Sequence, residues 1–393
     1  MKIAIDIRYR VKSGASTYIH GLLPSVLSAA GDEFDFVLVK YDSQPTPKGA
    51  EHLPVIETSA SGMAATLVWT NTVLPRQLKK HGVDLYHSMK MYGPARRTLP
   101  TVHTIHGRVK PRAGEFPMSP PQKLWHGCYG KGRFLNSCAV ISVSEHLGAF
   151  LKQDLGMPED KVRVIYSGIN DVFHDELQKQ LAGTADAPKH PPVVPEGVPY
   201  LLCLGNIEAV KNQATAVRAL AQIRDQVPHH LVIAGRPEKN CGAELNKTID
   251  ETGMRDRVHL PGFVPLENVV DVIKSADLLI HPSTSEGLCF SIVEAMACGL
   301  PVIGSDIPGI SEAAGNAGRY VRDPMDVDGF ASTIEATLAV PALMQRMASD
   351  GRQRALAFSW DNCAQQTLAV YRQCLSGCQP KQSRPSDSTS KAA

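Results

Sequence analysis

The sequence predicts an α/β protein with two doubly wound domains that face each other across a central cleft. Short apolar runs alternate with amphipathic stretches over most of the 393 residues, which is typical of βαβ units around a parallel sheet. A proline-rich segment without periodicity, residues 183–199, interrupts this alternation, which then restarts. The chain is also long for one domain and suits two.

The composition is that of an ordinary globular protein and excludes several other classes. Hydrophobic residues make up 43% and charged residues 20%, and the net charge of +2 argues against a nucleic-acid binder driven by bulk charge. We find no run of 18 apolar residues that could span a membrane, and the N-terminus is charged too early for a signal peptide. The nine cysteines include no Cys-x-x-Cys pair, which favours reduced thiols in the cytoplasm over disulfides or a zinc site.

The first domain is expected over residues 1–182. It begins with Met1–Arg8, which has the pattern of a buried strand. Further apolar runs predict strands, and the stretches between them predict helices. The expected strands are 2–7, 34–39, 53–57, 84–87, 101–105, 138–143 and 162–166, and the expected helices are 16–29, 63–80, 120–135 and 145–154.

The second domain is expected over residues 200–358, after a linker at 183–199. The same patterns predict strands at 200–204, 230–234, 257–260, 277–281, 301–304 and 318–321, and a helix at 212–225. A last helix is expected within 359–378, and its return to the first domain is left open. The polar tail, 379–393, is expected to be disordered.

Two glutamates eight positions apart, Glu286 and Glu294, form the most informative motif. A buried strand precedes Glu286, Gly287 permits a tight turn, and a helix starts before Glu294. Free N–H groups at a helix start bind phosphate, and carboxylates on either side could accept hydrogen bonds from hydroxyls. A nucleotide sugar has this layout of sugar hydroxyls, diphosphate and ribose hydroxyls. The alternative is a spacing that arises by chance.

Other candidate residues follow predicted strands. Lys211 comes after Gly205 and could neutralise a phosphate as a point charge, or be an ordinary surface lysine. Phe263 could flank a nucleobase or pack in the core. Gly14, after the first strand, could bring the backbone close to a ligand or make a plain turn. His106 follows a predicted strand and could contact a ligand there, or it could be a structural histidine with its hydrogen bonds made within the core.

From Leu201 to about Asp328, the second half resembles the retaining glycosyltransferases of family 4, which have the GT-B fold. The resemblance is carried by 258–264, 275–283, the Glu286 and Glu294 pair, 295–303 and 306–309. It implies that His106, Glu286 and Lys211 are catalytic, with His106 and Glu286 on the donor sugar and Lys211 on the diphosphate. Glu294 would hold the ribose hydroxyls. The remaining donor-binding residues implied are Gly14, Gly205, Asn206, Arg236, Phe263, Gly287, Leu288, Cys289 and Phe290, of which the last four would cradle the diphosphate. The family usually has arginine where this chain has Asn206, and Arg236 is a candidate substitute for that charge.

The resemblance implies retaining transfer of a hexose from a nucleotide-diphosphate sugar to a hydroxyl of a glycan or lipid-linked acceptor. Cell-surface polysaccharide synthesis is the expected context, and GDP-mannose is the first expected donor, without cofactor or metal. Two alternatives stay open: a nucleotide-sugar epimerase of the same fold, and a non-catalytic partner subunit that binds sugar nucleotides. The residues decide neither the donor base and sugar nor the oligomeric state.

A basic stretch in the first half suggests an anionic acceptor or an anionic membrane surface. Between Lys90 and Arg133 there are nine lysines or arginines and one acid, Glu115. The basic residues after Lys90 are Arg96, Arg97, Arg108, Lys110, Arg112, Lys123, Lys131 and Arg133. We therefore expect a cytoplasmic protein with peripheral membrane contact as one option, the alternative being a solvated basic face.

Overall fold

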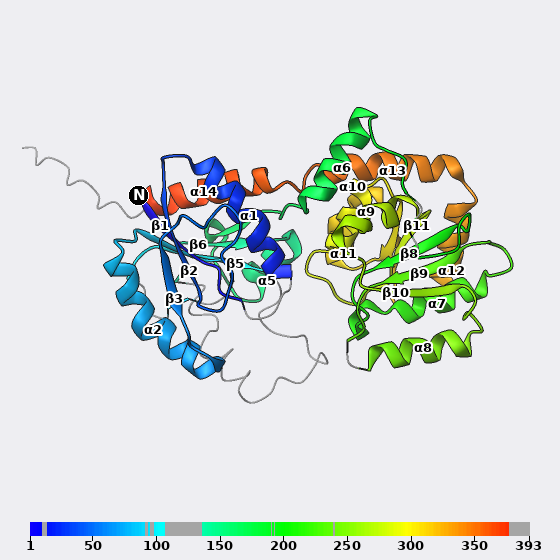
Figure 1. Ribbon diagram of the computed structural model, residues 1–393, viewed down its shortest axis with the longest axis horizontal. Coiled ribbons are helices and arrows are strands. Elements are labelled where there is room, and N and C mark those ends of the chain that lie inside the picture. The colour runs from blue at the N-terminus through cyan, green and yellow to red at the C-terminus, as the bar shows by residue number, and fades with distance from the viewer. Residues whose placement is uncertain are drawn as a thin grey trace, which may run out of the picture.

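The structure is a computed structural model that describes residues 1–9, 14–90, 93–94, 98–106, 136–189, 191, 193–238 and 240–376. It shows two α/β domains, each built around a parallel sheet with helices on both faces (Figure 1). In the described residues the first sheet has seven strands and the second has six. The expected pair of doubly wound domains is therefore confirmed.

The first sheet has the strand order β3-β2-β1-β4-β5-β6-β7, and every pairing in it is parallel. Its strands are buried on both faces, which explains why they are continuous apolar runs rather than alternating ones. The strands are β1 (Lys2–Asp6), β2 (Asp35–Tyr41), β3 (Val55–Thr58), β4 (Leu85–Ser88), β5 (Thr101–Ile105), β6 (Ala139–Ser142) and β7 (Val162–Val164). The helices between them are α1 (Gly14–Ala30), α2 (Gly62–Lys80) and α5 (Glu145–Gln153).

The second sheet has the order β10-β9-β8-β11-β12-β13 and is again parallel. Its strands are β8 (Tyr200–Leu204), β9 (His230–Ala234), β10 (Val258–Gly262), β11 (Leu278–His281), β12 (Val302–Ser305) and β13 (Arg319–Val321). Its helices are α7 (Gln213–Gln222), α8 (Cys241–Glu251), α9 (Leu266–Lys274), α10 (Phe290–Ala297), α11 (Pro308–Ala314), α12 (Val327–Leu338) and α13 (Pro341–Ala355). Helix α10 ends before Gly299, whose φ of 77° is the left-handed conformation expected just after a helix.

Each sheet has one point at which the winding reverses. In the first sheet β1 lies between β2 and β4, and in the second β8 lies between β9 and β11. The loops after β1 and β4 therefore leave their sheet in opposite directions, as do the loops after β8 and β11. Ligands of doubly wound sheets bind in the crevice that this reversal opens at the carboxyl ends of the strands.

The expected boundary of the first domain at residue 182 is wrong. Helix α6 (Asp171–Ala182) contributes Phe173 and Leu177 to the core of the second domain. A buried ion pair, Lys274 Nζ to Glu176 Oε1 at 2.7 Å, fastens α6 to α9. The chain thus enters the second domain by Ile169, which belongs to the same core.

The last helix, α14 (Trp360–Ser376), packs on α1 and belongs to the core of the first domain (Figure 1). The two chain crossings between domains lie side by side, because the amide of Ile169 donates to the carbonyl of Phe358 at 3.3 Å. Gly168 is required there, since a β-carbon on it would lie 2.4 Å from the backbone nitrogen of Trp360.

Two expected features lie outside the described residues, namely the helix at 120–135 and the tail at 379–393. The expected linker, 183–199, has no helix or strand in its described part. Among the described helices, none is long and apolar enough to cross a membrane. The described cysteines are free thiols.

Candidate active site

An ion pair marks the reversal point of the second sheet. Lys211 ends the short 3₁₀ helix η2 (Ala209–Lys211) after β8, and Glu286 lies in the loop after β11. Lys211 Nζ lies 2.7 Å from Glu286 Oε1. Burial alone would raise the pKa of Glu286, but the hydrogen bond from His281 and the charge of Lys211 outweigh it and lower that pKa to about 2. The carboxylate is therefore ionised at any physiological pH.

His281 is a site residue that the sequence reasoning missed. It is the buried last residue of β11, and its Nε2 lies 3.0 Å from the same Oε1 of Glu286. Burial lowers the pKa of His281, so the imidazole is neutral near pH 7 and donates from Nε2 to the carboxylate. The available signal was a polar residue at the carboxyl end of an apolar strand.

A third side chain, Cys289, completes this cluster. Its Sγ lies 3.2 Å from His281 Nε2. The atoms of His281, Glu286 and Cys289 that could coordinate a metal ion all lie within 4.8 Å of one another. Burial raises the pKa of the Cys289 thiol far above its usual range, which opposes the thiolate that a metal would need. The ammonium of Lys211 already supplies a cation to Glu286. The absence of a metal site stays a prediction.

The loop after Glu286 presents backbone N–H groups. The amide of Cys289 donates to the carbonyl of Gly309 at 3.1 Å and is not available to a ligand. The amides of Gly287, Leu288, Phe290 and Ser291 have no backbone or side-chain acceptor among the described residues. These groups lie at the start of α10, where unpaired donors and the helix dipole favour an anion.

Glu294 faces a pocket of about 250 Å³ on the other side of this helix start. The pocket is lined by Gly205, Asn206, Gly235, Phe263, Ser291 and Glu294, together with apolar residues that include Phe173 of α6. Burial raises the pKa of Glu294 to about 7. Its carboxyl group has no hydrogen-bond partner in the described part of the chain, so both oxygens are available to a ligand.

Two candidate donor-binding residues, the aromatic Phe263 and the basic Arg236, lie at the rim of the pocket. Phe263 is 58% exposed, and the guanidinium of Arg236 lies 4.5 Å from the centre of its ring. Core packing of Phe263, the alternative from the sequence, does not occur. The side chain of Asn206 is exposed on the pocket wall, while Gly235 is held so close to Gly205 that a β-carbon would lie 2.0 Å from the Gly205 carbonyl oxygen.

His106 reaches the site from the first domain. A β-carbon added to Gly287 would lie 2.9 Å from the carbonyl oxygen of His106, so the two loops touch across the cleft. His106 Nε2 donates to the carbonyl of Met89 at 2.9 Å, and Tyr18 packs edge-on against the ring at 4.6 Å. Burial lowers the pKa of His106 to about 4, so the ring is neutral.

The structure thus brings His106, Lys211, Glu286 and Gly287 to one place and puts Glu294 on the adjoining pocket. Gly14 is the first residue of α1, and its contacts are not described. Of the basic stretch, Lys90 is described, whereas Arg96, Arg97, Arg108, Lys110, Arg112, Lys123, Lys131 and Arg133 lie outside the described residues.

Two parallel-sheet domains with this site at the reversal point of the second sheet define a GT-B glycosyltransferase. Family models agree: "Glycosyltransferase Family 4" matches residues 12–173 and "Glycosyl transferases group 1" matches residues 187–354. The chain belongs to glycosyltransferase family 4, as the resemblance of its motifs predicted.

Three relatives illustrate the range of similarity. An uncharacterized glycosyltransferase of Methanocaldococcus jannaschii is 26% identical, with 95% of this chain and 98% of the relative covered. An MMP alpha-(1->4)-mannosyltransferase of Mycolicibacterium hassiacum is 25% identical over 74% of this chain and 71% of the relative. A D-inositol 3-phosphate glycosyltransferase of Xylanimonas cellulosilytica is 27% identical over 70% and 66%.

Solved structures share the fold at lower identity. Sucrose-phosphate synthase from Thermosynechococcus elongatus superposes with a TM-score of 0.73 at 22% identity, covering 96% of this chain and 99% of that one. Anabaena HepE in complex with UDP gives a TM-score of 0.70 at 19% identity, with 95% and 100% covered.

Proposed function

We propose that this glycosyltransferase moves a hexose, with mannose as the first candidate, from a nucleotide-diphosphate sugar to a hydroxyl with retention of configuration. The acceptor is a glycan or a lipid-linked sugar of cell-surface polysaccharide synthesis, met at the cytoplasmic face of the membrane. The observation that carries this proposal is the cluster of Lys211, His281 and Glu286 beside the free amides of the loop at Gly287.

The loop amides and Lys211 are suited to the leaving diphosphate. Departure of a diphosphate concentrates negative charge, and fixed donors aimed at developing charge supply much of the catalysis in such sites. Although burial disfavours its charge, Lys211 has a raised pKa because Glu286 lies beside it. It therefore keeps its proton and acts as a fixed positive charge rather than as an acid.

Glu286 is suited to binding sugar hydroxyls. Its Oε1 is engaged by Lys211 and His281, whereas Oε2 has no partner in the described residues. A carboxylate with a pKa of about 2, held by two donors, is a firm acceptor and a poor nucleophile. This favours attack by the acceptor on the face from which the diphosphate leaves, which keeps the anomeric configuration.

Glu294 and Phe263 are suited to the nucleoside. Two ribose hydroxyls would donate to the two free oxygens of Glu294, and the exposed ring of Phe263 would flank the base at the pocket rim. His106 would contact the transferred sugar from the first domain. None of these roles requires a metal or another cofactor.

GDP-mannose is the first donor to test, because two of the relatives are named mannosyltransferases. UDP-sugars belong in the same panel, because HepE is described with UDP and UDP-glucose. Purified protein would be incubated with each nucleotide sugar, with and without a panel of glycan and polyprenyl-linked acceptors. Release of nucleoside diphosphate would be measured, and the product's anomeric configuration determined by NMR.

The outcomes separate the alternatives. Acceptor-dependent release with an unchanged anomeric configuration supports the proposal. Release of free epimerised sugar without acceptor indicates the epimerase, and an inverted product contradicts retention. Tight binding of a nucleotide sugar without any turnover favours the non-catalytic subunit.

A further inference from the structure

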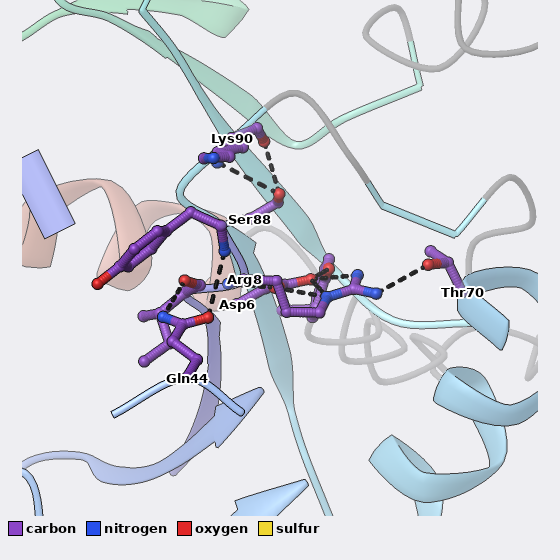
Figure 2. A network of polar contacts seen from close by, with 9 residues as sticks. Asp6, Arg8, Gln44, Thr70, Ser88 and Lys90 are labelled. Atoms are coloured by element: carbon purple, nitrogen blue, oxygen red, sulfur yellow. Dashed lines mark hydrogen bonds and ion pairs between the residues drawn. The ribbon is translucent and has the colours of Figure 1, made fainter. Parts of the chain in front are cut away.

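A second polar cluster lies at the reversal point of the first sheet, where β1 and β4 are neighbours. It contains Asp6 at the end of β1, Arg8 after β1 and Lys90 after β4 (Figure 2). Tyr9, next to Arg8, belongs to the same cluster because its ring lies beside the Lys90 ammonium. The proposed donor site uses none of these residues. The same topological rule that places a ligand at β8 and β11 also applies to this crevice.

One charged pair in the cluster, Arg8 and Asp6, makes its polar contacts within the protein. Arg8 binds Asp6 in a two-pronged arrangement, with Nε to Oδ1 at 2.9 Å and Nη2 to Oδ2 at 2.6 Å, and both side chains are buried. Nη1 of Arg8 donates to Thr70 Oγ1 at 3.0 Å (Figure 2). The hydroxyl of Tyr86 donates to Asp6. The pair is neutral as a unit and has a structural role.

Lys90 is the positive charge that remains. Its backbone is fixed by Ser88, whose hydroxyl donates to the Lys90 carbonyl at 2.5 Å (Figure 2). Its half-buried ammonium has no carboxylate or hydrogen-bond acceptor among the described residues and lies 5.7 Å from the centre of the Tyr9 ring. Burial lowers the pKa of Lys90, and the nearby charge of Asp6 only partly offsets this. An anion beside it would relieve this desolvation cost.

Tyr9 extends the cluster towards α1. Its hydroxyl lies 2.8 Å from Nε2 of His20, an exposed residue of α1. Tyr9 therefore has Lys90 over its ring and an imidazole at its hydroxyl. The combination places an ammonium and an imidazole around one aromatic wall.

The position of this cluster links it to the proposed reaction. Met89, next to Lys90, accepts the hydrogen bond of His106 Nε2, and the charge of Lys90 helps to lower the pKa of His106. His106 in turn touches the donor loop at Gly287. A group seated on Lys90 would therefore lie beside His106, in the domain opposite the nucleotide.

We propose that Lys90, with Tyr9 and His20, forms an anion subsite that takes a phosphate, or a chemically similar sulfate or carboxylate, carried by the acceptor. This inference rests on the proposed function, because it assigns a negative charge to the acceptor of the proposed transfer reaction. It does not use the basic residues of 91–135. Several relatives carry the name D-inositol 3-phosphate glycosyltransferase, which is consistent with a phosphorylated acceptor.

Inorganic phosphate tests the subsite directly. Lysines of the full chain would be reductively ¹³C-methylated and observed by NMR while phosphate is added, with GDP or UDP at saturation to fill the nucleotide site. One signal, identified as Lys90 by its loss in Lys90→Met, should shift saturably. Lys79→Met is the matched control, because Lys79 is an exposed lysine of α2 whose ammonium has no partner among the described residues, and it should leave that shift unchanged. A Lys90 signal that does not move overturns the inference.

Paired acceptors provide the second test. Each pair differs by one phosphate: inositol and inositol 3-phosphate, mannose and mannose 6-phosphate, and a neutral and a phosphorylated polyprenyl sugar. Wild type should prefer the charged member at least tenfold, and Lys90→Met should lose the preference through a higher KM, with Lys90→Arg retaining part of it. Equal preference in wild type and Lys90→Met overturns the inference.

Two further measurements distinguish a lipid phosphate from a soluble one, and failure of the subsite from failure of the proposed function. Vesicles of phosphatidylcholine with or without phosphatidic acid distinguish a lipid phosphate, which would recruit wild type but not Lys90→Met, from a soluble one. Absence of nucleotide binding and of any transfer would sink the proposed function, while the phosphate titration would still decide the subsite by itself.

Discussion

At the scale of single residues, Glu294 has an ionisation that the fold controls. Its pKa of about 7 is raised by burial from an ordinary value of 4.5, so the group is partly protonated at neutral pH. A carboxylate accepts hydrogen bonds from ribose hydroxyls better than a neutral carboxyl does. Nucleoside diphosphate affinity should therefore rise with pH through about 7, because deprotonation produces the form that binds.

Calorimetry of the matching nucleoside diphosphate, from pH 6 to pH 8.5, measures this dependence. Glu294→Gln should lose the part of it that belongs to the carboxyl, and Glu294→Ala should weaken binding by about 1–3 kcal/mol at pH 8. Titration of the phosphates themselves is common to all variants and cancels in the comparison. Unchanged affinity in Glu294→Ala would remove Glu294 from the nucleotide site.

Glu286 should affect turnover more than nucleotide binding. Glu286→Gln keeps the shape of the side chain but loses the charge that Lys211 and His281 hold in place. We expect kcat to fall about 10²-fold, the scale found when a charge-stabilising group is removed from an active site. Binding of free nucleoside diphosphate should persist. Collapsed nucleotide binding with normal turnover at saturation would mean that Glu286 and Glu294 have exchanged roles.

Asn206→Arg should maintain or raise activity. The Asn206 side chain is exposed on the pocket wall and free of partners in the described residues, so an arginine has room there. Arg236 lies against Phe263 rather than beside Lys211, which leaves the position of the extra charge open. Donor KM should fall, less so at high salt. A lower activity in a variant with an unchanged melting temperature would contradict the missing-charge hypothesis.

At the scale of elements, the two crossings between the domains are packed against each other. Gly168→Ala would put a β-carbon 2.4 Å from the Trp360 nitrogen and 2.5 Å from its ring, so the backbone must shift. We expect a loss of about 1–3 kcal/mol in unfolding free energy, measured by urea titration. Ser167→Ala is the neighbouring control, because it removes a buried hydroxyl without a partner and should be neutral or stabilising. Equal stability of both variants would contradict the packing argument.

Elements whose pattern is local could be predicted from the sequence. The described strands fall close to their expected ranges, because a doubly wound strand is a short apolar run between turns. The assignment of α6 failed for a physical reason: an amphipathic helix reveals that one face is buried, but not in which core. Phe173 and Glu176 bind partners from the second domain, which lie about a hundred residues further along the chain.

The residues of the proposed donor site could be listed from the sequence, but their geometry could not. The Glu286 and Glu294 spacing and the position of Lys211 are visible in the sequence, whereas the contact between Lys211 and Glu286 depends on β8 and β11 being neighbours. The role of His281 depends on the loop folding back over it. The cluster at Lys90 and Tyr9 likewise exists because β1 and β4 are adjacent in the sheet, although Ile3 of β1 and its partner Leu85 of β4 are far apart in the chain.

At the scale of the whole molecule, Glu312 connects the two domains. It lies on α11 of the second domain, and its carboxylate accepts from the amides of Glu145 and His146 at the start of α5 in the first, the latter at 3.0 Å. Arg354 donates to the Glu312 carbonyl at 2.6 Å and fixes the residue on its own side. A carboxylate at a helix N-terminus gains from both the free amides and the dipole.

Glu312→Ala should therefore loosen the closed arrangement of the domains. Loss of two charge-assisted hydrogen bonds costs about 1.5–3 kcal/mol, enough to shift the balance between closed and open forms by one to two orders of magnitude. Because His106 and Gly287 meet only when the domains are close, kcat/KM should fall, while nucleoside diphosphate binding to the second domain should change little.

Small-angle scattering and an interdomain fluorescence pair measure this opening directly. Glu312→Gln should have an intermediate effect, because the amide oxygen can still accept but carries no charge for the α5 dipole. Glu335→Gln, on the exposed face of α12, is the control and should leave both readouts unchanged. If Glu312→Ala keeps the wild-type radius of gyration and kcat/KM, the contact contributes nothing to closure, and packing of the paired crossings alone must hold the domains together.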